Sequence, residues 1–209
     1  METVRGAPAG LAGRASEALP MAGHSSLDEE QTIRQCLSGD VEAFSVLVER
    51  YKIMVYTVAY RILGDADAAN DAAQDSFIAA FTSLSHFRFG SKFSTWLYSI
   101  VLNKCRDRLR AVKDFVGVDD IRELRADPAG TPEQRALEGE AQSEVQEALS
   151  ALPAAYREVL VLKHIQGLAY AEMAEILGAS VAALKVRAHR GREMLRAVME
   201  KAGIVYEER

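Results

Sequence analysis

The sequence predicts an all-α protein: two small helical domains joined by a flexible acidic linker, the second a helix-turn-helix domain. Apolar residues recur at steps of three and four in both halves of the 209-residue chain. In the first half they form the apolar stripe of an amphipathic helix: Phe44, Leu47, Val48, Tyr51, Val55, Val58, Ala59 and Ile62. The alternation typical of β-strands does not appear. The helical period fails between residues 114 and 140, where Pro128, Gly130 and Pro132 interrupt the chain and acids outnumber bases.

Composition favours a globular chain with a local surface for nucleic acid. Hydrophobic residues make up 49% of the sequence, which is ample for packed cores. Charged residues make up 26% but sum to a net charge of −5, whereas a protein whose whole surface grips nucleic acid is expected to be basic. Any nucleic-acid surface is therefore expected to occupy only part of the chain.

Cysteine, histidine and carboxylate patterns predict no chemistry of their own. Cys36 and Cys105 stand far apart without a CxxC spacing, so reduced thiols are expected. The four histidines are scattered, and no Ser-His or paired-carboxylate motif recurs. We expect no catalytic residues, no metal and no cofactor, and hence a protein that is not an enzyme.

Hydropathy predicts a cytoplasmic protein. No uninterrupted apolar run in the sequence approaches the ~20 residues that a membrane span requires. The first residues are rich in Ala and Gly but lack the compact hydrophobic region of a signal peptide. We therefore expect no membrane insertion.

Changes in composition and period divide the chain into four segments. Small residues and two prolines predict a mobile tail over residues 1–26. The first domain is expected over residues 27–113, the linker over 114–140 and the second domain over 141–209. The first domain should contain three long helices: from after Gly39-Asp40 to Gly64-Asp65, from about Ala66 to Leu84, and from near Phe93 to about Lys113.

The second domain has the spacing of a helix-turn-helix. A short helix should end at Gly178, and Ser180 should cap a longer helix after a tight turn. A turn of 100° per residue places these residues of the longer helix on its inner face: Val181, Leu184, Ala188, Gly191, Leu195 and Val198. Gly191 would allow a neighbouring helix to come close, although glycine costs a helix roughly 1 kcal/mol.

The opposite face of this longer helix carries short side chains and cations. Its members are Ala182, Lys185, Val186, His189 and Arg190, with Arg187 and Arg192 near the edges. Such a face suits the major groove, where Lys and Arg reach guanine acceptors or phosphates and Val can contact a thymine methyl. The alternative is a solvated basic face on an ordinary surface helix.

The loop before the third helix brackets Gly and Ser with aromatic rings and cations. It reads Phe87, Arg88, Phe89, Gly90, Ser91 and Lys92. Proteins that hold single-stranded nucleic acid stack bases on rings and follow the backbone with cations. We interpret residues 87–91 as a candidate base pocket, whereas Phe93 and Trp96 are expected to pack in the core.

The third helix has one polar face, and the second helix carries a pair of acids. The polar face includes Ser99, Asn103, Arg106, Asp107 and Arg110. Asn pairs bidentately with adenine and arginines neutralise phosphates, but an ordinary polar face is an equal alternative.

Asp71 and Asp75 lie four residues apart on the second helix, on the face opposite Phe77 and Phe81. This like-charge pair costs a few tenths of a kcal/mol unless a basic partner offsets it.

Taken together, these segments resemble the sigma factors of bacterial RNA polymerase, in particular the small two-domain group called extracytoplasmic-function (ECF) sigma factors. The resemblance runs from about Leu27 to Val198. It is carried by five segments in the order of the family: GDVEAFSVLVERY, AANDAAQDSF, FRFGSKFSTWLYSIVLNKCRDRLR, ALPAAYREVLVLKHIQGLAYAEMAEILG and SVAALKVRAHRGREMLR. Five segments in order are far more specific than a lone helix-turn-helix.

The resemblance implies partners and site residues. Core RNA polymerase would bind through the clamp of its largest subunit and the flap of its second largest, with Asp71, Gln74 and Asp75 as the clamp contacts. The promoter's minus-10 element would be melted and held by Phe87, Arg88, Phe89, Gly90, Ser91, Lys92, Asn103, Arg106, Asp107 and Arg110. The minus-35 element would be read by Lys163, Ser180, Ala182, Lys185, Val186, Arg187, His189 and Arg190. The acidic linker would follow the basic RNA path of the polymerase.

The family also implies an anti-sigma factor as a partner and an envelope or stress regulon. Three departures from the family pattern affect the minus-35 contacts. Ala169 stands where a Ser or Thr usually caps the first helix of the helix-turn-helix, Ala182-Ala183-Leu184 replaces the usual Gly-Thr-Val, and Val186 replaces a common Ser. The alternative function is a stand-alone helix-turn-helix regulator, which would need to bind duplex DNA by itself. The net charge of −5 argues against that alternative.

Overall fold

The computed structural model of the chain describes residues 26–116 and 140–203. These residues form helices joined by turns, with one isolated bridge between Phe89 and Ser91, so the predicted all-α class is confirmed. The elements are α1 (Ser26–Leu37), α2 (Ala43–Leu63), α3 (Ala66–Thr82), the 3-10 turn η1 (Leu84–His86), α4 (Phe93–Val116), α6 (Glu140–Ser150), α7 (Ala154–Leu160), the π-helical turn η3 (Val161–Ile165), α8 (Tyr170–Leu177) and α9 (Val181–Lys201). The predicted tail and linker lie almost wholly outside the described residues.

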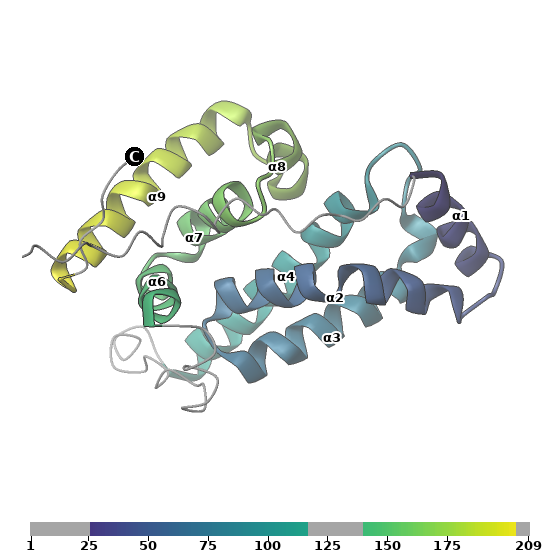
Figure 1. The fold of residues 1–209 in the computed structure, drawn as a ribbon, viewed down its shortest axis with the longest axis horizontal. Coiled ribbons are helices and arrows are strands. Elements are labelled where there is room, and N and C mark those ends of the chain that lie inside the picture. Colours follow the sequence, from purple (N-terminus) through teal and green to yellow (C-terminus); the bar gives the residue numbers. More distant parts are fainter. Residues whose placement is uncertain (1–25, 117–139, 204–209) are drawn as a thin grey trace, which may run out of the picture.

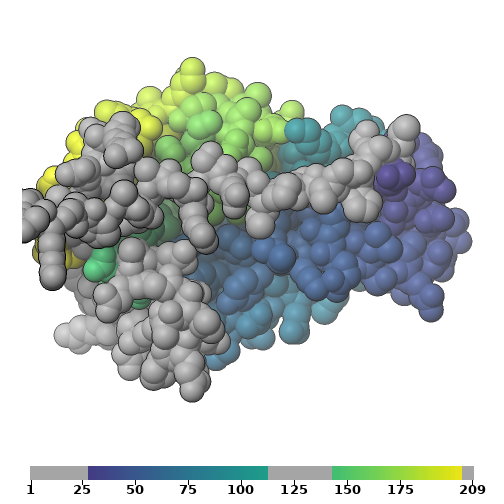
Figure 2. All heavy atoms as spheres, in the orientation of Figure 1, coloured from purple at the N-terminus to yellow at the C-terminus, as the bar shows by residue number. Residues whose placement is uncertain are grey.

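Two groups of helices are visible in Figure 1. Helices α2, α3 and α4 lie side by side with α1 at one end, whereas α7, α8 and α9 lie along one side of this bundle. Helix α6 lies against α2 and α9. The predicted division into two helical domains is therefore confirmed, and the space-filling view shows the second domain resting on the first (Figure 2).

The helix ends follow the local signals in the sequence. Gly64 has a left-handed φ of +79° and closes α2, and the Asp65 carboxylate accepts the Ala68 N–H at 2.7 Å to start α3. Asp40 accepts the N–H of Ala43 at 3.1 Å. The Ser180 hydroxyl accepts the Ala183 N–H at 3.2 Å, which confirms it as the cap of α9.

The core of the first domain is built from the predicted stripe of α2. Its fully or almost fully buried members are Leu47, Tyr51, Val55, Val58, Ala59 and Ile62. Phe93 at the start of α4 is 1% exposed, and Trp96 packs partly buried against the same core, as predicted. Burial of this many large apolar side chains is the main stabilisation available to a bundle of this size.

The core of the second domain holds α9 close to α7. A Cβ atom at Gly191 would lie 3.3 Å from the Cγ atom of Leu160, which confirms that this glycine permits a close approach. Leu184 and Ala188 are buried as predicted, but Val181 is 37% exposed. Val181 is the first residue of α9 and is exposed there, so its predicted inner position is wrong.

The two domains share one apolar core. Val159, Leu162 and Met173 are buried in the same cluster as the α2 and α4 residues. Arg157 of α7 adds a polar anchor: its buried guanidinium donates to the backbone carbonyls of Ile62 in α2, of Ser150 and of Leu152. Burial lowers the pKa of this guanidinium to about 10, yet it stays charged at neutral pH.

Candidate nucleic-acid and polymerase interfaces

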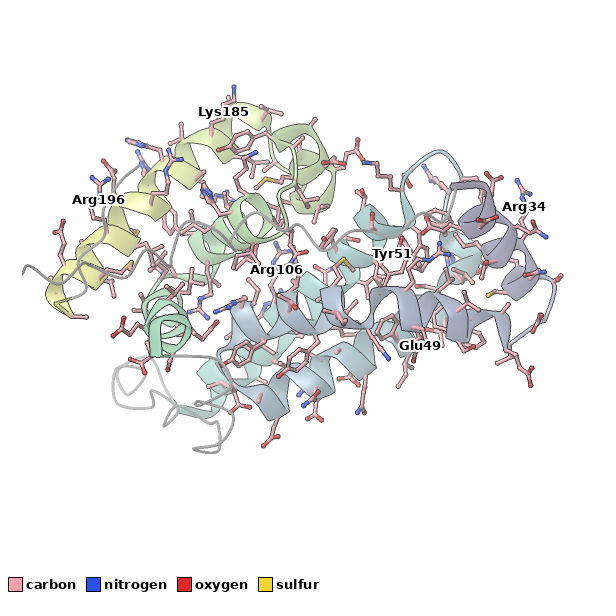
Figure 3. All side chains as sticks on the ribbon, in the orientation of Figure 1. Arg34, Glu49, Tyr51, Arg106, Lys185 and Arg196 are labelled. Carbon is pink, nitrogen blue, oxygen red and sulfur yellow. The ribbon has the colours of Figure 1, made fainter. Side chains whose placement is uncertain are left out.

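The outer face of α9 is exposed as the sequence predicted. Ala182, Lys185, Val186, His189 and Arg190 are exposed, and Arg187 is half-buried. Figure 3 shows Lys185 on the side of α9 that points away from the rest of the molecule. His189 Nε2 lies 3.4 Å from Glu193 Oε1, which is an ion pair only when the imidazole is protonated. This helix therefore presents a surface of short side chains and cations that suits a DNA groove.

Lys163 lies apart from this face, in the π-helical turn η3. Its Nζ donates to the Leu168 carbonyl at 3.1 Å and lies 5.0 Å from the centroid of the Tyr170 ring. Ala169 at the start of α8 has no side chain to cap the helix, but its own N–H donates to Glu172 Oε2 at 3.0 Å. Glu172 thus supplies part of the capping that Ala169 forgoes.

The loop before α4 has one open ring. Phe87 is 7% exposed and packs against Phe93 and Trp96, with ring centroids 5.7 and 5.5 Å apart. Phe89 is 41% exposed and meets Phe87 edge to face at 5.5 Å. The expectation that Phe87 lines an open pocket is corrected, because the ring has joined the core and only Phe89 presents a face outside it.

Arg34 of α1 lies on that open ring, which sequence reasoning missed. Its guanidinium carbon is 4.4 Å from the Phe89 centroid, within the range of a cation–π contact. Arg34 Nε also donates to Glu30 Oε1 at 3.2 Å. No local pattern links a residue of α1 to a loop that follows α3, so only the fold brings them together.

On the polar face of α4, three residues are exposed and one, Arg106, is bound to the second domain. Asn103, Asp107 and Arg110 are exposed, and Arg110 Nη1 lies 3.2 Å from Asp107 Oδ1. Arg106 Nη1 donates to Asn103 Oδ1 at 3.2 Å, but the rest of its guanidinium turns to Glu158 of α7. The predicted face is therefore present, with Arg106 committed to the second domain.

Two cations of the candidate minus-10 set are paired with acids across the domain boundary. Arg106 forms a fork to Glu158, with donor–acceptor distances of 2.7 and 2.6 Å, and the Glu158 side chain is only 4% exposed. The hydrogen bond to Glu158 raises the pKa of Arg106. Lys92 Nζ lies 2.6 Å from Glu172 Oε1, and that bond raises the pKa of Lys92 and lowers the pKa of Glu172. Figure 3 shows Arg106 between α7 and the first-domain bundle.

The acidic surface of α3 is exposed, and one arginine of the same chain neutralises part of its charge. Asp71, Gln74 and Asp75 are all exposed. Arg108 of α4 reaches both carboxylates: Nη1 is 3.4 Å from Asp71 Oδ2 and Nη2 is 2.7 Å from Asp75 Oδ2. The basic partner that the acid pair called for is thus present in the chain itself, and the sequence analysis had not assigned it.

The described ranges offer no other obvious chemistry. No group of three His, Cys, Asp or Glu side chains within them is arranged to hold a metal ion. No helix in these ranges is long and apolar enough to cross a membrane. The thiol of Cys105 is buried, and burial raises its pKa to about 12, so this cysteine is a packing residue.

Comparison with family models places the two domains in one family. The model of sigma-70 region 2 matches residues 47–114, which cover most of α2, all of α3 and most of α4. The model of sigma-70 region 4 matches residues 142–195, from α6 into α9. The candidate clamp and minus-10 residues lie within the first match, and the candidate minus-35 residues lie within the second. Arg34 lies before the first match.

Relatives and solved structures agree with this placement. ECF RNA polymerase sigma factor SigW of Bacillus subtilis (strain 168) is 37% identical over 182 residues, covering 80% of this chain and 94% of the relative. RNA polymerase sigma-H factor of Pseudomonas aeruginosa is 31% identical over 176 residues, covering 80% and 91%. The structure of CnrH in complex with the cytosolic domain of CnrY matches with a TM-score of 0.62 and 28% identity, covering 83% of this chain and 98% of that one.

A second solved structure supports the fold alone. It is the sigma factor RpoE in complex with the anti-sigma factor NepR from Bartonella quintana, which matches with a TM-score of 0.60 and 23% identity over 77% of this chain and 98% of that one. These similarities support a sigma factor over a stand-alone helix-turn-helix regulator. The chain belongs to the sigma-70 family and is an ECF sigma factor of RNA polymerase.

Proposed function

We propose that this sigma factor divides promoter recognition between its two domains while the α3 surface holds the polymerase. Asp71, Gln74 and Asp75 dock on the clamp of the largest subunit, and the second domain docks on the flap of the second largest. Their exposure on one face of α3 supports this assignment. Arg108 pairs with both carboxylates while they remain exposed, and a basic clamp surface would compete with Arg108 for them.

The first domain melts the minus-10 element and holds the non-template strand. The exposed ring of Phe89 supplies a stacking face for an unpaired base, with Arg88, Gly90 and Ser91 around it. Phe87 supports that ring from the core. The face of Asn103, Asp107 and Arg110 on α4 contacts the strand beyond the loop.

Two residues of this strand-binding set must change partners before they touch DNA. Arg106 and Lys92 are paired with Glu158 and Glu172 of the second domain. The second domain therefore has to move away from α4 when the protein engages polymerase and promoter. The phosphates of the strand then replace the two carboxylates as partners of these cations.

The second domain inserts α9 into the major groove of the minus-35 element. Lys185, Val186 and Arg190 are the exposed residues best placed for base edges, with Ala182, Arg187 and His189 beside them and Ser180 at the helix start. Lys163 contacts a neighbouring phosphate once it leaves the Leu168 carbonyl. Affinity comes mainly through the polymerase, which is compatible with a net charge of −5.

The biological setting follows from the same proposal. The protein acts in the cytoplasm as a regulatory rather than a catalytic subunit, and it controls an envelope or stress regulon. An anti-sigma factor holds it inactive, and the solved structure of CnrH bound to the cytosolic domain of CnrY is compatible with a protein partner of this kind. No cofactor is required.

The observation that carries the proposal is that the Phe89 loop, the outer face of α9 and the Asp71–Asp75 side of α3 are three separate exposed surfaces on a chain of this family. Purified protein should direct specific transcripts when mixed with core RNA polymerase and promoter fragments from its own genome. Tight binding to duplex DNA without polymerase, with no initiation, would contradict the proposal.

A set of variants separates the three surfaces. Asp75→Arg should weaken polymerase binding, Asn103→Ala and Phe89→Ala should impair promoter opening after the polymerase has bound, and Lys185→Ala should weaken minus-35 recognition. Polymerase binding is measured by fluorescence anisotropy and promoter opening by permanganate footprinting. Equal loss of both activities in every variant would indicate misfolding instead of separate surfaces.

A further inference from the structure

We infer that Arg34 is a base-contacting residue of the minus-10 pocket: the unpaired base enters between its guanidinium and the Phe89 ring. This inference rests on the proposed function of the Phe89 loop. It concerns a residue of α1, which lies outside the region 2 match at residues 47–114. The contact that carries it is the 4.4 Å separation between the Arg34 guanidinium carbon and the Phe89 centroid.

The guanidinium occupies the place that a stacked base needs. At 4.4 Å from the ring centroid, it leaves no room for a base between the two planes. Two layers in van der Waals contact require about 7 Å between the outer planes, because each contact takes about 3.5 Å. A base can enter only if Arg34 moves outward by roughly 3 Å, and the planar guanidinium then covers the second face of the base.

The side chain is free to make that movement. The Arg34 side chain is 62% exposed, and the Glu30 carboxylate that pairs with it is 43% exposed on the same helix. Arg34 therefore moves on a long flexible stem without disturbing packed residues. Because Phe89 is 41% exposed as well, the entry to the ring lies at the surface.

The two partners are mounted on rigid supports. Next to Arg34, Ile33 is 1% exposed in the core, and Glu29 ties α1 to α2 by accepting from the Tyr51 hydroxyl and lying 3.4 Å from Arg50 Nη1. Phe89 is held edge to face by the buried Phe87 ring. The helix that carries Arg34 and the Phe89 ring are therefore both held in place, while the Arg34 side chain above the ring can move. Such an arrangement suits a site that stacks a base between the ring and the guanidinium.

The test compares intact and abasic DNA. Holoenzyme assembled from core polymerase and the full chain is titrated with fork-junction DNA in which the minus-10 part of the non-template strand is single-stranded. A series of such templates carries one abasic site at each minus-10 position in turn. With the wild-type protein, the template that lacks the captured base should bind more weakly than the intact template.

Arg34→Ala should weaken binding of the intact template by about three- to tenfold and leave the template without the captured base unchanged. Arg34→Lys should fall between the two proteins, because it keeps the charge but loses the plane. Lys52→Ala is the matched control, since Lys52 is an exposed cation paired with Glu49 on α2, and it should bind like wild type. Thermal unfolding of each variant reports whether the fold is intact.

Two results would overturn the inference. An equal loss on intact and abasic templates would make Arg34 a backbone or structural contact, and tighter binding of the intact template would make it a simple obstacle on the ring. The base pocket itself fails in a different way. If no abasic site weakens the wild-type holoenzyme, then the proposed function of the loop is wrong, whatever Arg34 does.

Discussion

Removing Arg106 should destabilise the protein more than removing the acid it pairs with. The Glu158 side chain is 4% exposed, and it receives both forked N–H bonds of Arg106, at 2.7 and 2.6 Å. The Arg106 side chain is 31% exposed. Arg106→Met therefore leaves a buried carboxylate without its hydrogen-bonded partner, whereas Glu158→Gln leaves a guanidinium that can turn to water.

The size of the difference follows from these exposures. Breaking a fully buried pair by removing one member costs about 3–5 kcal/mol. Because water reaches the arginine side of this pair, we expect the lower part of that range or slightly less, about 2–3 kcal/mol, for Arg106→Met. Glu158→Gln keeps an acceptor for one hydrogen bond, so about 1 kcal/mol is expected.

Urea unfolding followed by circular dichroism measures both values. With a slope of about 2 kcal/mol per molar urea, Arg106→Met should lower the midpoint by about 1 M and Glu158→Gln by about half of that. The double variant tests whether the two losses share one interaction. Equal losses, or a larger loss for Glu158→Gln, would refute the view that the buried acid dominates the energetics of this pair.

Three further predictions concern other contacts. Arg108→Ala should cost no more than about 1 kcal/mol of unfolding free energy, because the acids it meets are half or more exposed; a urea-midpoint loss as large as that of a core variant would contradict this. Gly191→Val should cost about 1–3 kcal/mol by overpacking against α7, while Gly191→Ala stays near neutral; equal urea midpoints for both would argue against tight packing there. The Lys92–Glu172 pair should stabilise the fold at pH values above the ordinary pKa of a carboxyl group, and this stabilisation should be lost as the pH falls through the lowered pKa of Glu172. The difference in urea midpoint between wild type and Glu172→Gln should therefore become smaller at acidic pH, and a difference that does not change with pH would contradict this prediction.

Local signals in the sequence predicted the helices well. Gly64, Asp65 and Ser180 act within one or two turns of chain, and their caps lie where the sequence placed them. The stripe of α2 was also predictable, because one helix face meets one core. The outer face of α9 was recognised for the same reason, since a helix that packs on one side leaves its other side to solvent.

The conformation of the loop at residues 87–92 and the ion pairs between the two domains could not be predicted from local sequence signals. Residues 87–92 have no period, so a helical wheel cannot tell that Phe87 turns inward and Phe89 outward. The partners of Arg106, Lys92 and Phe89 come from segments distant in the sequence. Such contacts depend on how helices meet, and one sequence without its fold carries no signal for them.

The shared core has a consequence for dividing the polypeptide. Because Val159, Leu162 and Met173 are buried in one cluster with α2 and α4, a cut between residues 116 and 140 would leave each half with an uncovered apolar surface. The two halves should therefore associate when they are co-expressed, and the hydrogen bond from Arg157 to the Ile62 carbonyl at the end of α2 would contribute to this association. If the two halves of a split reporter were fused to these halves of the protein, the reporter activity in living cells would fall when the two domains separate.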